Sequence, residues 1–262
     1  VYATRQLALK VMHEAPERAV TLLERAAKAG NASNLMNDLK PLITSGNLRA
    51  IELADNEIVA KEPKKAFELA LLTADKNKAV AIRLYERAID AGDEYASTGN
   101  LANLISEEEP ERARKLYERA ISAGETRYAT NNLADLIAHN EPERAKELYE
   151  QAISAGDKYY APRNLALLII DRDPNRAISL LETAAKNGNK RNFAVDLETV
   201  IKNGNTKAIR LYESALIVKD KTKANDLAEL IKGRMPERAD DLYRLAIAAG
   251  DERYATFNLA CL

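Results

Sequence analysis

A row of asparagines and aspartates at one recurring position is the feature of this sequence best suited to bind a ligand. Each residue stands directly before a leucine that recurs every 30 to 32 residues. The row, which we call the Asn/Asp ladder, consists of Asp38, Asn100, Asn132, Asn164, Asp196, Asp226 and Asn258. Asn and Asp are poor residues for a helix interior because their side chains compete for backbone hydrogen bonds, so their recurrence needs a reason.

Two interpretations of the Asn/Asp ladder follow from its chemistry. A carboxamide both donates and accepts hydrogen bonds, so it can pair with a peptide unit of any sequence. A row of such groups would suit an extended peptide. Alternatively, the side chains bond a neighbouring helix and set the spacing between repeats. The residues alone leave both interpretations open.

The elements that position the ladder are helices, as the stretch 111–137 illustrates. Ala113, Tyr117 and Ala120 recur at spacings of three and four, which places them on one face of a first helix. Gly124 ends this helix, because glycine takes the left-handed conformation without penalty. Leu133 and Ile137 then mark the apolar face of a second helix. Neither helix buries its apolar stripe alone, so both must pack on copies of themselves.

The same two helices recur along the chain with a period of 31 to 32 residues. An alanine marks eight first helices, at Ala19, Ala50, Ala81, Ala113, Ala145, Ala177, Ala208 and Ala239. A leucine marks nine second helices, at Leu7, Leu39, Leu69, Leu101, Leu133, Leu165, Leu197, Leu227 and Leu259. Glycines end six of the first helices, at Gly30, Gly92, Gly124, Gly156, Gly188 and Gly250. A fixed period in this range predicts an all-α solenoid of about eight stacked two-helix repeats.

Two sets of tyrosines recur with the repeats. The first helices carry Tyr85, Tyr117, Tyr149, Tyr212 and Tyr243, which leucine replaces in two copies. We interpret this set as core. The second helices are preceded by Tyr2, Tyr128, Tyr160 and Tyr254. For this set we favour packing between repeats, with the rim of a binding groove as the alternative.

No set of residues predicts catalysis, a metal or a cofactor. The only histidines, His13 and His139, lie about four repeats apart and have no cysteine or carboxylate cluster at the spacing of metal ligands. Cys261 is the only cysteine, so an intrachain disulfide is impossible. No glycine-rich phosphate loop follows a strand pattern. We therefore predict that the chain is not an enzyme.

The unit 131–157 resembles tetratricopeptide-type repeats, and more closely the subclass of Sel-one-like repeats. The resemblance rests on Leu133-Ala134, Ala145, Tyr149, Ala152 and the closing Gly156-Asp157. It covers nearly the whole chain, although these units are shorter than the roughly 34 residues of a tetratricopeptide repeat. The resemblance implies a right-handed superhelix that binds a protein or peptide in its concave groove. It also implies that residues 1–262 form a single helical-repeat domain, which we expect to be part of a longer protein.

In tetratricopeptide-like arrays the position of the Asn/Asp ladder lines the inner groove. Further positions on the same helix face would then flank a ligand. These possible flanking residues are Asn103, Glu107, Asp135, His139, Asp171 and Asn203. They vary between copies, as specificity positions do, but solvated surface residues also vary.

The leading hypothesis is therefore a non-catalytic scaffold that binds another protein or an extended peptide. An alternative is a regulatory or assembly arm of a larger enzyme or sensor. RNA binding is less favoured, because 39 Lys and Arg against 40 Asp and Glu provide no positive field for phosphates. No apolar run spans a membrane and no signal peptide is visible in the sequence, which favours the cytoplasm.

Overall fold

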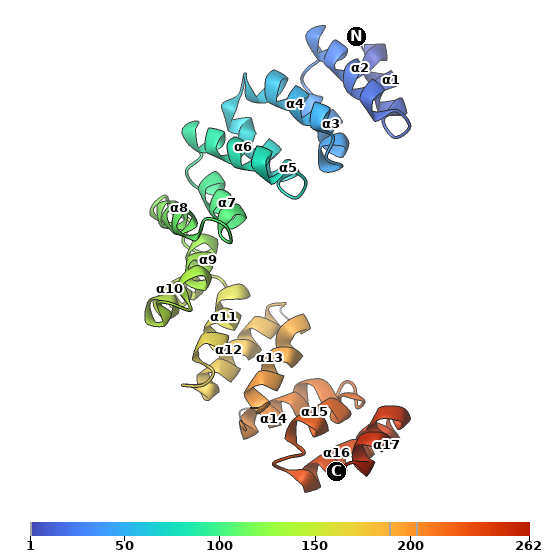
Figure 1. Cartoon of the computed structure of the whole chain (residues 1–262), viewed down its shortest axis with the longest axis vertical. Helices are drawn as coiled ribbons and strands as arrows, with labels where there is room; N and C mark the ends of the chain where they lie inside the picture. The colour runs from blue at the N-terminus through green and yellow to red at the C-terminus, as the bar shows by residue number, and fades with distance from the viewer. Residues whose placement is uncertain (1, 189, 203) are drawn as a thin grey trace. The chain divides into compact units, whose positions relative to one another are not determined.

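The computed structural model describes residues 2–188, 190–202 and 204–262, and this part of the chain contains seventeen α-helices and no strand (Figure 1). It consists of two compact units, Val1–Leu136 and Ile137–Leu262, each of which is described by itself. The eight first helices are α2 (Pro16–Lys28), α4 (Leu48–Ala54), α6 (Lys78–Asp90), α8 (Pro110–Ser122), α10 (Pro142–Ser154), α12 (Pro174–Lys186), α14 (Thr206–Tyr212) and α16 (Pro236–Ala248). The nine second helices are α1 (Tyr2–Val11), α3 (Leu35–Thr44), α5 (Ala66–Thr73), α7 (Ala96–Ile105), α9 (Tyr128–Ile137), α11 (Tyr160–Ile169), α13 (Lys190–Lys202), α15 (Lys223–Ile231) and α17 (Glu252–Ala260).

The predicted all-α solenoid is confirmed, because first and second helices alternate and pack on their neighbours within each unit. Helix α6, for example, contacts α5 before it and α7 after it, and α12 contacts α11 and α13 in the same way. Each repeated alanine of the first helices is fully buried. The absence of a larger side chain at these positions lets the helices approach closely. That one domain covers residues 1–262 stays a prediction.

The repeated leucines and the tyrosines of the first helices form the core. Among the leucines only Leu7 and Leu259, in the first and the last helix, are not buried. Tyr85, Tyr117, Tyr149, Tyr212 and Tyr243 are all buried, which confirms their interpretation as core. The inward face of each helix is therefore the one that the period of 3.6 residues predicts.

The predicted glycine stops are confirmed, since all six glycines have positive φ angles. At the end of α8 the Gly124 N–H donates to Ile121 O and the Glu125 N–H donates to Ala120 O, at 3.0 and 2.9 Å. This pair of bonds satisfies carbonyl groups that the helix leaves unpaired, and it requires the left-handed conformation at Gly124, where φ is +103°.

Two repeats end their first helix without a glycine, and both do so with a π-helical turn. The turns are η1 (Asp55–Val59) after α4 and η3 (Glu213–Ile217) after α14, and a 3₁₀ turn, η2 (Pro63–Lys65), follows η1 before α5. In each π-helix an N–H donates to the carbonyl five residues earlier, from Ala60 to Asp55 and from Val218 to Glu213. The helices thus persist in these two repeats, as the sequence predicts, but their ends are wider than an α-helical turn.

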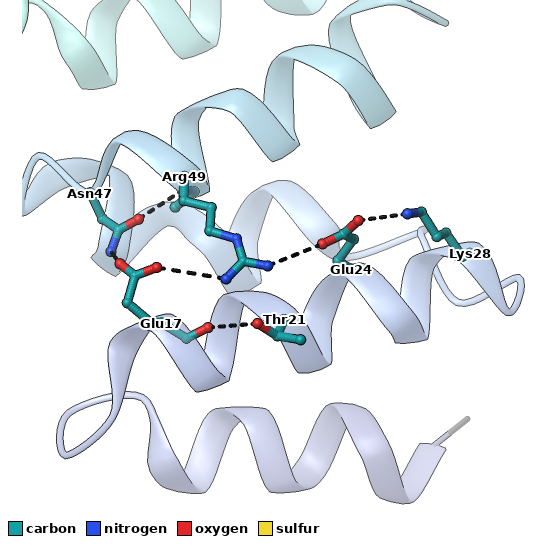
Figure 2. Close-up of polar contacts among 7 residues, drawn as sticks. Glu17, Thr21, Glu24, Lys28, Asn47 and Arg49 are labelled. Atoms are coloured by element: carbon teal, nitrogen blue, oxygen red, sulfur yellow. Dashed lines mark hydrogen bonds and ion pairs between the residues drawn. The ribbon is translucent and has the colours of Figure 1, made fainter.

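Polar contacts join consecutive first helices at the surface of each unit. Figure 2 shows the contact between α2 and α4. The Asn47 side chain begins α4 by accepting a hydrogen bond from the Ala50 N–H at 2.9 Å, and it donates another to Glu17 at 2.7 Å. Arg49 lies between Glu17 and Glu24 at 3.8 and 3.6 Å. Arg49 and Glu17 are exposed, so water screens their ion pair, and it contributes little to stability.

Candidate binding surface on the second helices

Two residues of the Asn/Asp ladder are buried and bound to arginines of the preceding second helix. Asp196 accepts hydrogen bonds from Nε and Nη2 of Arg163, both at 2.7 Å, and only 4% of Asp196 is exposed. Asp38 accepts from the same two atoms of Arg5 at 2.5 and 2.7 Å. This bidentate geometry matches a guanidinium to a carboxylate. At these two positions the ladder joins consecutive repeats, as one of the two interpretations proposes.

The other ladder residues are half-buried and hold more varied contacts. The Asn258 amide donates to Oδ1 of Asn225 in the preceding second helix at 3.0 Å. Asn100 donates to the Ala96 carbonyl of its own helix at 2.8 Å, and Asp226 accepts from Lys223 at 2.9 Å. Asn132 and Asn164 are half-buried as well. These positions therefore keep part of their surface in contact with solvent.

Three predicted site residues meet around the hydroxyl group of Tyr117. This hydroxyl donates to Oδ1 of Asn103 at 3.4 Å. Burial raises the pKa of Tyr117 to about 12, a shift that a hydrogen bond with Asn132 opposes and the charge of Asp135 supports. Asn132 in turn accepts from the neighbouring Asn131 at 3.1 Å. The structure thus brings ladder and flanking residues from α7 and α9 together around one core tyrosine.

The remaining flanking residues do not join this cluster. Glu107 and His139 are exposed, each in the turn that follows a second helix. Asp171 is exposed beside a hollow of about 210 Å³ that is also lined by Arg172 and Arg176. Asn203 lies outside the described residues.

The tyrosines at the start of the second helices are exposed, contrary to the packing role that we favoured. Tyr2, Tyr128, Tyr160 and Tyr254 expose 50 to 70% of their surface. The Arg127 guanidinium lies 4.3 Å from the centre of the Tyr128 ring, and Tyr159 meets Tyr160 edge to face at 4.4 Å. The rings of Tyr128, Tyr160 and Tyr254 each contact the residue directly before them in the sequence.

The repeat pattern did not predict a role for two further exposed aromatic residues and two arginines. Tyr95, directly before α7, exposes 51% of its surface, and Phe257, in the second half of α17, exposes 68%. Arg5 and Arg163 could have been recognised as partners, since each stands 33 residues before a ladder aspartate. That signal is visible only when residues are compared between consecutive repeats.

The buried tyrosines predict a loss of stability at high pH in the unit Val1–Leu136. Burial raises the pKa of Tyr85 and of Tyr117 to about 12 from an ordinary value of 10.0. The unfolded chain releases these protons first, so the stabilising contribution is complete below pH 10 and is lost as the pH rises from 10 to about 12. We expect the melting temperature to fall over this range. In the double variant Tyr85→Phe, Tyr117→Phe the fall should be smaller, and an equally steep fall would contradict the assignment.

No cluster in the described residues has the composition of a metal site, and no helix in that part of the chain is long and apolar enough to cross a membrane. The groups that the candidate surface presents are amides, carboxylates and aromatic rings. These groups can hold a ligand by hydrogen bonds and by stacking.

Comparison with known families identifies the repeat. A sequence model of the Sel1 repeat, the Sel-one-like unit named above, matches residues 14–31, 66–93, 105–125, 131–157 and 167–189. These stretches each contain parts of a first helix, and they lie on both sides of the boundary between the two units. A comparison with curated proteins finds no match. Sel1 repeats are generally non-catalytic scaffolds for protein interactions. With its alternating helices and buried alanines, this chain is a Sel1-like helical-repeat protein.

Proposed function

We propose that the chain is a non-catalytic scaffold that binds another protein or an extended peptide through the second-helix surface. The observation that carries this proposal is the neighbourhood of α7 and α9, where exposed rings adjoin half-buried amides. Tyr128 and Asn132 stand four residues apart and so share one face of α9. Tyr95 stands directly before α7, one residue ahead of the position that corresponds to Tyr128, and Asn100 lies within α7.

This surface combines the two contacts that an extended peptide requires. Exposed tyrosine rings offer apolar area at a low cost in side-chain entropy, which is why such rings are frequent at interaction hot spots. The amides of Asn100 and Asn132 can bond to a peptide backbone irrespective of its sequence. The groove that the family resemblance implies for the Asn/Asp ladder belongs to the same proposal. The buried ion pairs at Asp38 and Asp196 would then support the surface without touching the ligand.

The test is a peptide-display selection on the purified chain, followed by affinity measurements with a variant that carries Tyr95→Ala and Tyr128→Ala. We expect binding to weaken about tenfold or more, since truncation of a hot-spot tyrosine costs over roughly 1 kcal/mol. The melting temperature should stay unchanged, because both rings are about half exposed. The tyrosines are a cleaner probe than the asparagines, because Asn132 also bonds to the buried Tyr117.

The control is Tyr254→Ala, which removes a ring in the unit Ile137–Leu262 that is 62% exposed, against 50 and 51% for Tyr128 and Tyr95. If both variants bind the selected peptides as the unchanged chain does, the proposed surface is wrong. Selection of RNA oligomers in place of peptides, with affinity that falls steeply with salt, would also overturn it.

A further inference from the structure

The two π-helices stand at equivalent places in the chain. Their first residues, Asp55 and Glu213, lie 158 residues apart. The same number of residues separates Gly46 from Gly204, the glycines after α3 and α13. It also separates Arg5 from Arg163, each of which pairs with a ladder aspartate. Each unit therefore contains one copy of the same unusual repeat, with five repeats from one copy to the next.

A hollow opens beside each π-helix, at the edge where first helices end and second helices begin. In the unit Ile137–Leu262 it encloses about 490 Å³ and lies among α12, η3 and the starts of α13 and α15. In the unit Val1–Leu136 the hollow encloses about 400 Å³ beside η1. The hollow beside η1 is lined by Ile58, Lys61 and Lys65. The equivalent residues beside η3 are Leu216, Lys219 and Lys223.

The π-helical turn accounts for the hollow. A hydrogen bond across five residues widens the helix and replaces the compact Ala-Gly turn of the other repeats. Leu216 is left only half-buried at the end of η3. Together with Ala185, Phe193, Leu211 and Ala215 it forms an apolar floor, which we call the η3 pocket. A floor of this kind can bury an apolar side chain from another molecule.

The two hollows differ in charge at one decisive position. In the unit Val1–Leu136, Glu57 neutralises Lys61 at 2.9 Å. The equivalent of Glu57 is Ala215, and no ion pair to Lys219 occurs in the part of the chain that the structure describes. The nearby Asp220 instead accepts from the Thr222 hydroxyl at 2.6 Å. Around its apolar floor the η3 pocket thus carries three lysines against two carboxylates, Glu182 and Asp220, whereas its counterpart carries two lysines against three glutamates, Glu57, Glu62 and Glu68.

The rim determines which ligand suits the η3 pocket. Lys186 and Lys219 are exposed at its edge, and the rim carries a third lysine, Lys223, which pairs with Asp226 at 2.9 Å. We infer that the η3 pocket binds an apolar side chain of a partner peptide whose neighbouring residues are acidic. The apolar side chain enters the floor, and the partner's carboxylates lie against Lys186 and Lys219. This site is separate from the surface of α7 and α9, so either one can fail without the other.

The experiment titrates the full chain into a labelled peptide of glutamates around one phenylalanine and follows fluorescence anisotropy. We expect saturable binding that weakens with salt. The variant Ala215→Glu restores the charge found beside η1 and places a side chain in the pocket, so it should weaken binding about tenfold or more. The variant Lys219→Ala should weaken binding less and reduce its salt dependence. The methyl resonances of Ala215 and Leu216 should shift on binding.

Two controls separate this site from the rest of the chain. Glu57→Ala, the matched change beside η1, should not weaken binding, and neither should Tyr95→Ala with Tyr128→Ala. Unchanged affinity in both Ala215→Glu and Lys219→Ala would overturn the inference, as would a peptide with glycine for phenylalanine that binds equally well. The inference is also wrong if vesicles or a fatty acid shift the Leu216 methyl groups and the peptide does not.

Discussion

Replacing Arg163 with alanine is expected to lower the free energy of unfolding by about 3 kcal/mol, because it leaves a buried carboxylate without its partner. Asp196 is 4% exposed and receives two hydrogen bonds from Arg163 at 2.7 Å. Loss of one member of such a pair costs more than the pair itself contributes. The measurement is urea-induced unfolding of the full chain, followed by circular dichroism.

The matched control for this change is Arg176→Ala. Arg176 pairs with Glu150 between consecutive first helices at 2.8 Å, but 44 and 41% of the two side chains are exposed. Water and salt screen such a pair, so its loss should cost less than about 1 kcal/mol. The double variant Arg163→Ala, Asp196→Ala should recover part of the loss, because it removes the stranded charge. If Arg163→Ala and Arg176→Ala lower the free energy of unfolding equally, the burial of Asp196 does not raise the cost of losing its partner.

Replacing Tyr212 with phenylalanine is expected to have the opposite effect and to stabilise the chain by about 1 kcal/mol. Tyr212 is fully buried, and its hydroxyl has no hydrogen-bond partner among the described residues. Burial, with the charges of Asp226 and Glu198, raises the pKa of Tyr212. A buried hydroxyl without a partner loses its hydration and gains nothing in return, so its removal relieves that cost.

The control is Tyr243→Phe in the same unit. The Tyr243 hydroxyl donates to Oε1 of Glu229, and a hydrogen bond to a charged group contributes roughly 2 kcal/mol. This variant should therefore be less stable than the unchanged chain, by thermal or urea unfolding. A loss of stability in both variants would mean that the Tyr212 hydroxyl has a partner, such as a bound water molecule.

The missing partner of Tyr212 coincides with a shorter turn and with a different residue at the acceptor position. The acceptors for Tyr117 and Tyr243 stand 14 residues earlier, at Asn103 and Glu229. The turn between α13 and α14 is one residue shorter, as the spacing of Leu197 and Ala208 shows against that of Leu227 and Ala239. Thr199, which takes the place of the acceptor, donates its hydroxyl to its own helix at Val195 O.

Much of the fold could be predicted from the sequence, because it depends on contacts between residues close along the chain. The apolar period of 3.6 residues specifies which face of each helix is buried, as Ala113, Tyr117 and Ala120 show. Gly124 ends its helix because glycine adopts a positive φ angle without penalty, which depends only on the local backbone. Because the repeats are similar to one another, they can bury their apolar faces by stacking. The all-α solenoid and its core were therefore predictable.

The roles of the polar residues depended on the tertiary structure, because they involve residues of different repeats. The sequence left open whether the ladder binds a ligand or joins repeats, and the pairing of Asp196 with Arg163 appears only when α11 and α13 lie side by side. The exposure of Tyr128 depends in the same way on where the helix begins relative to its neighbours. The π-helix at Glu213–Ile217, and with it the η3 pocket, arises where a repeat without a helix-ending glycine must still fit the stack. Local patterns determine the helices, whereas the contacts between repeats determine which side chains remain available to a partner.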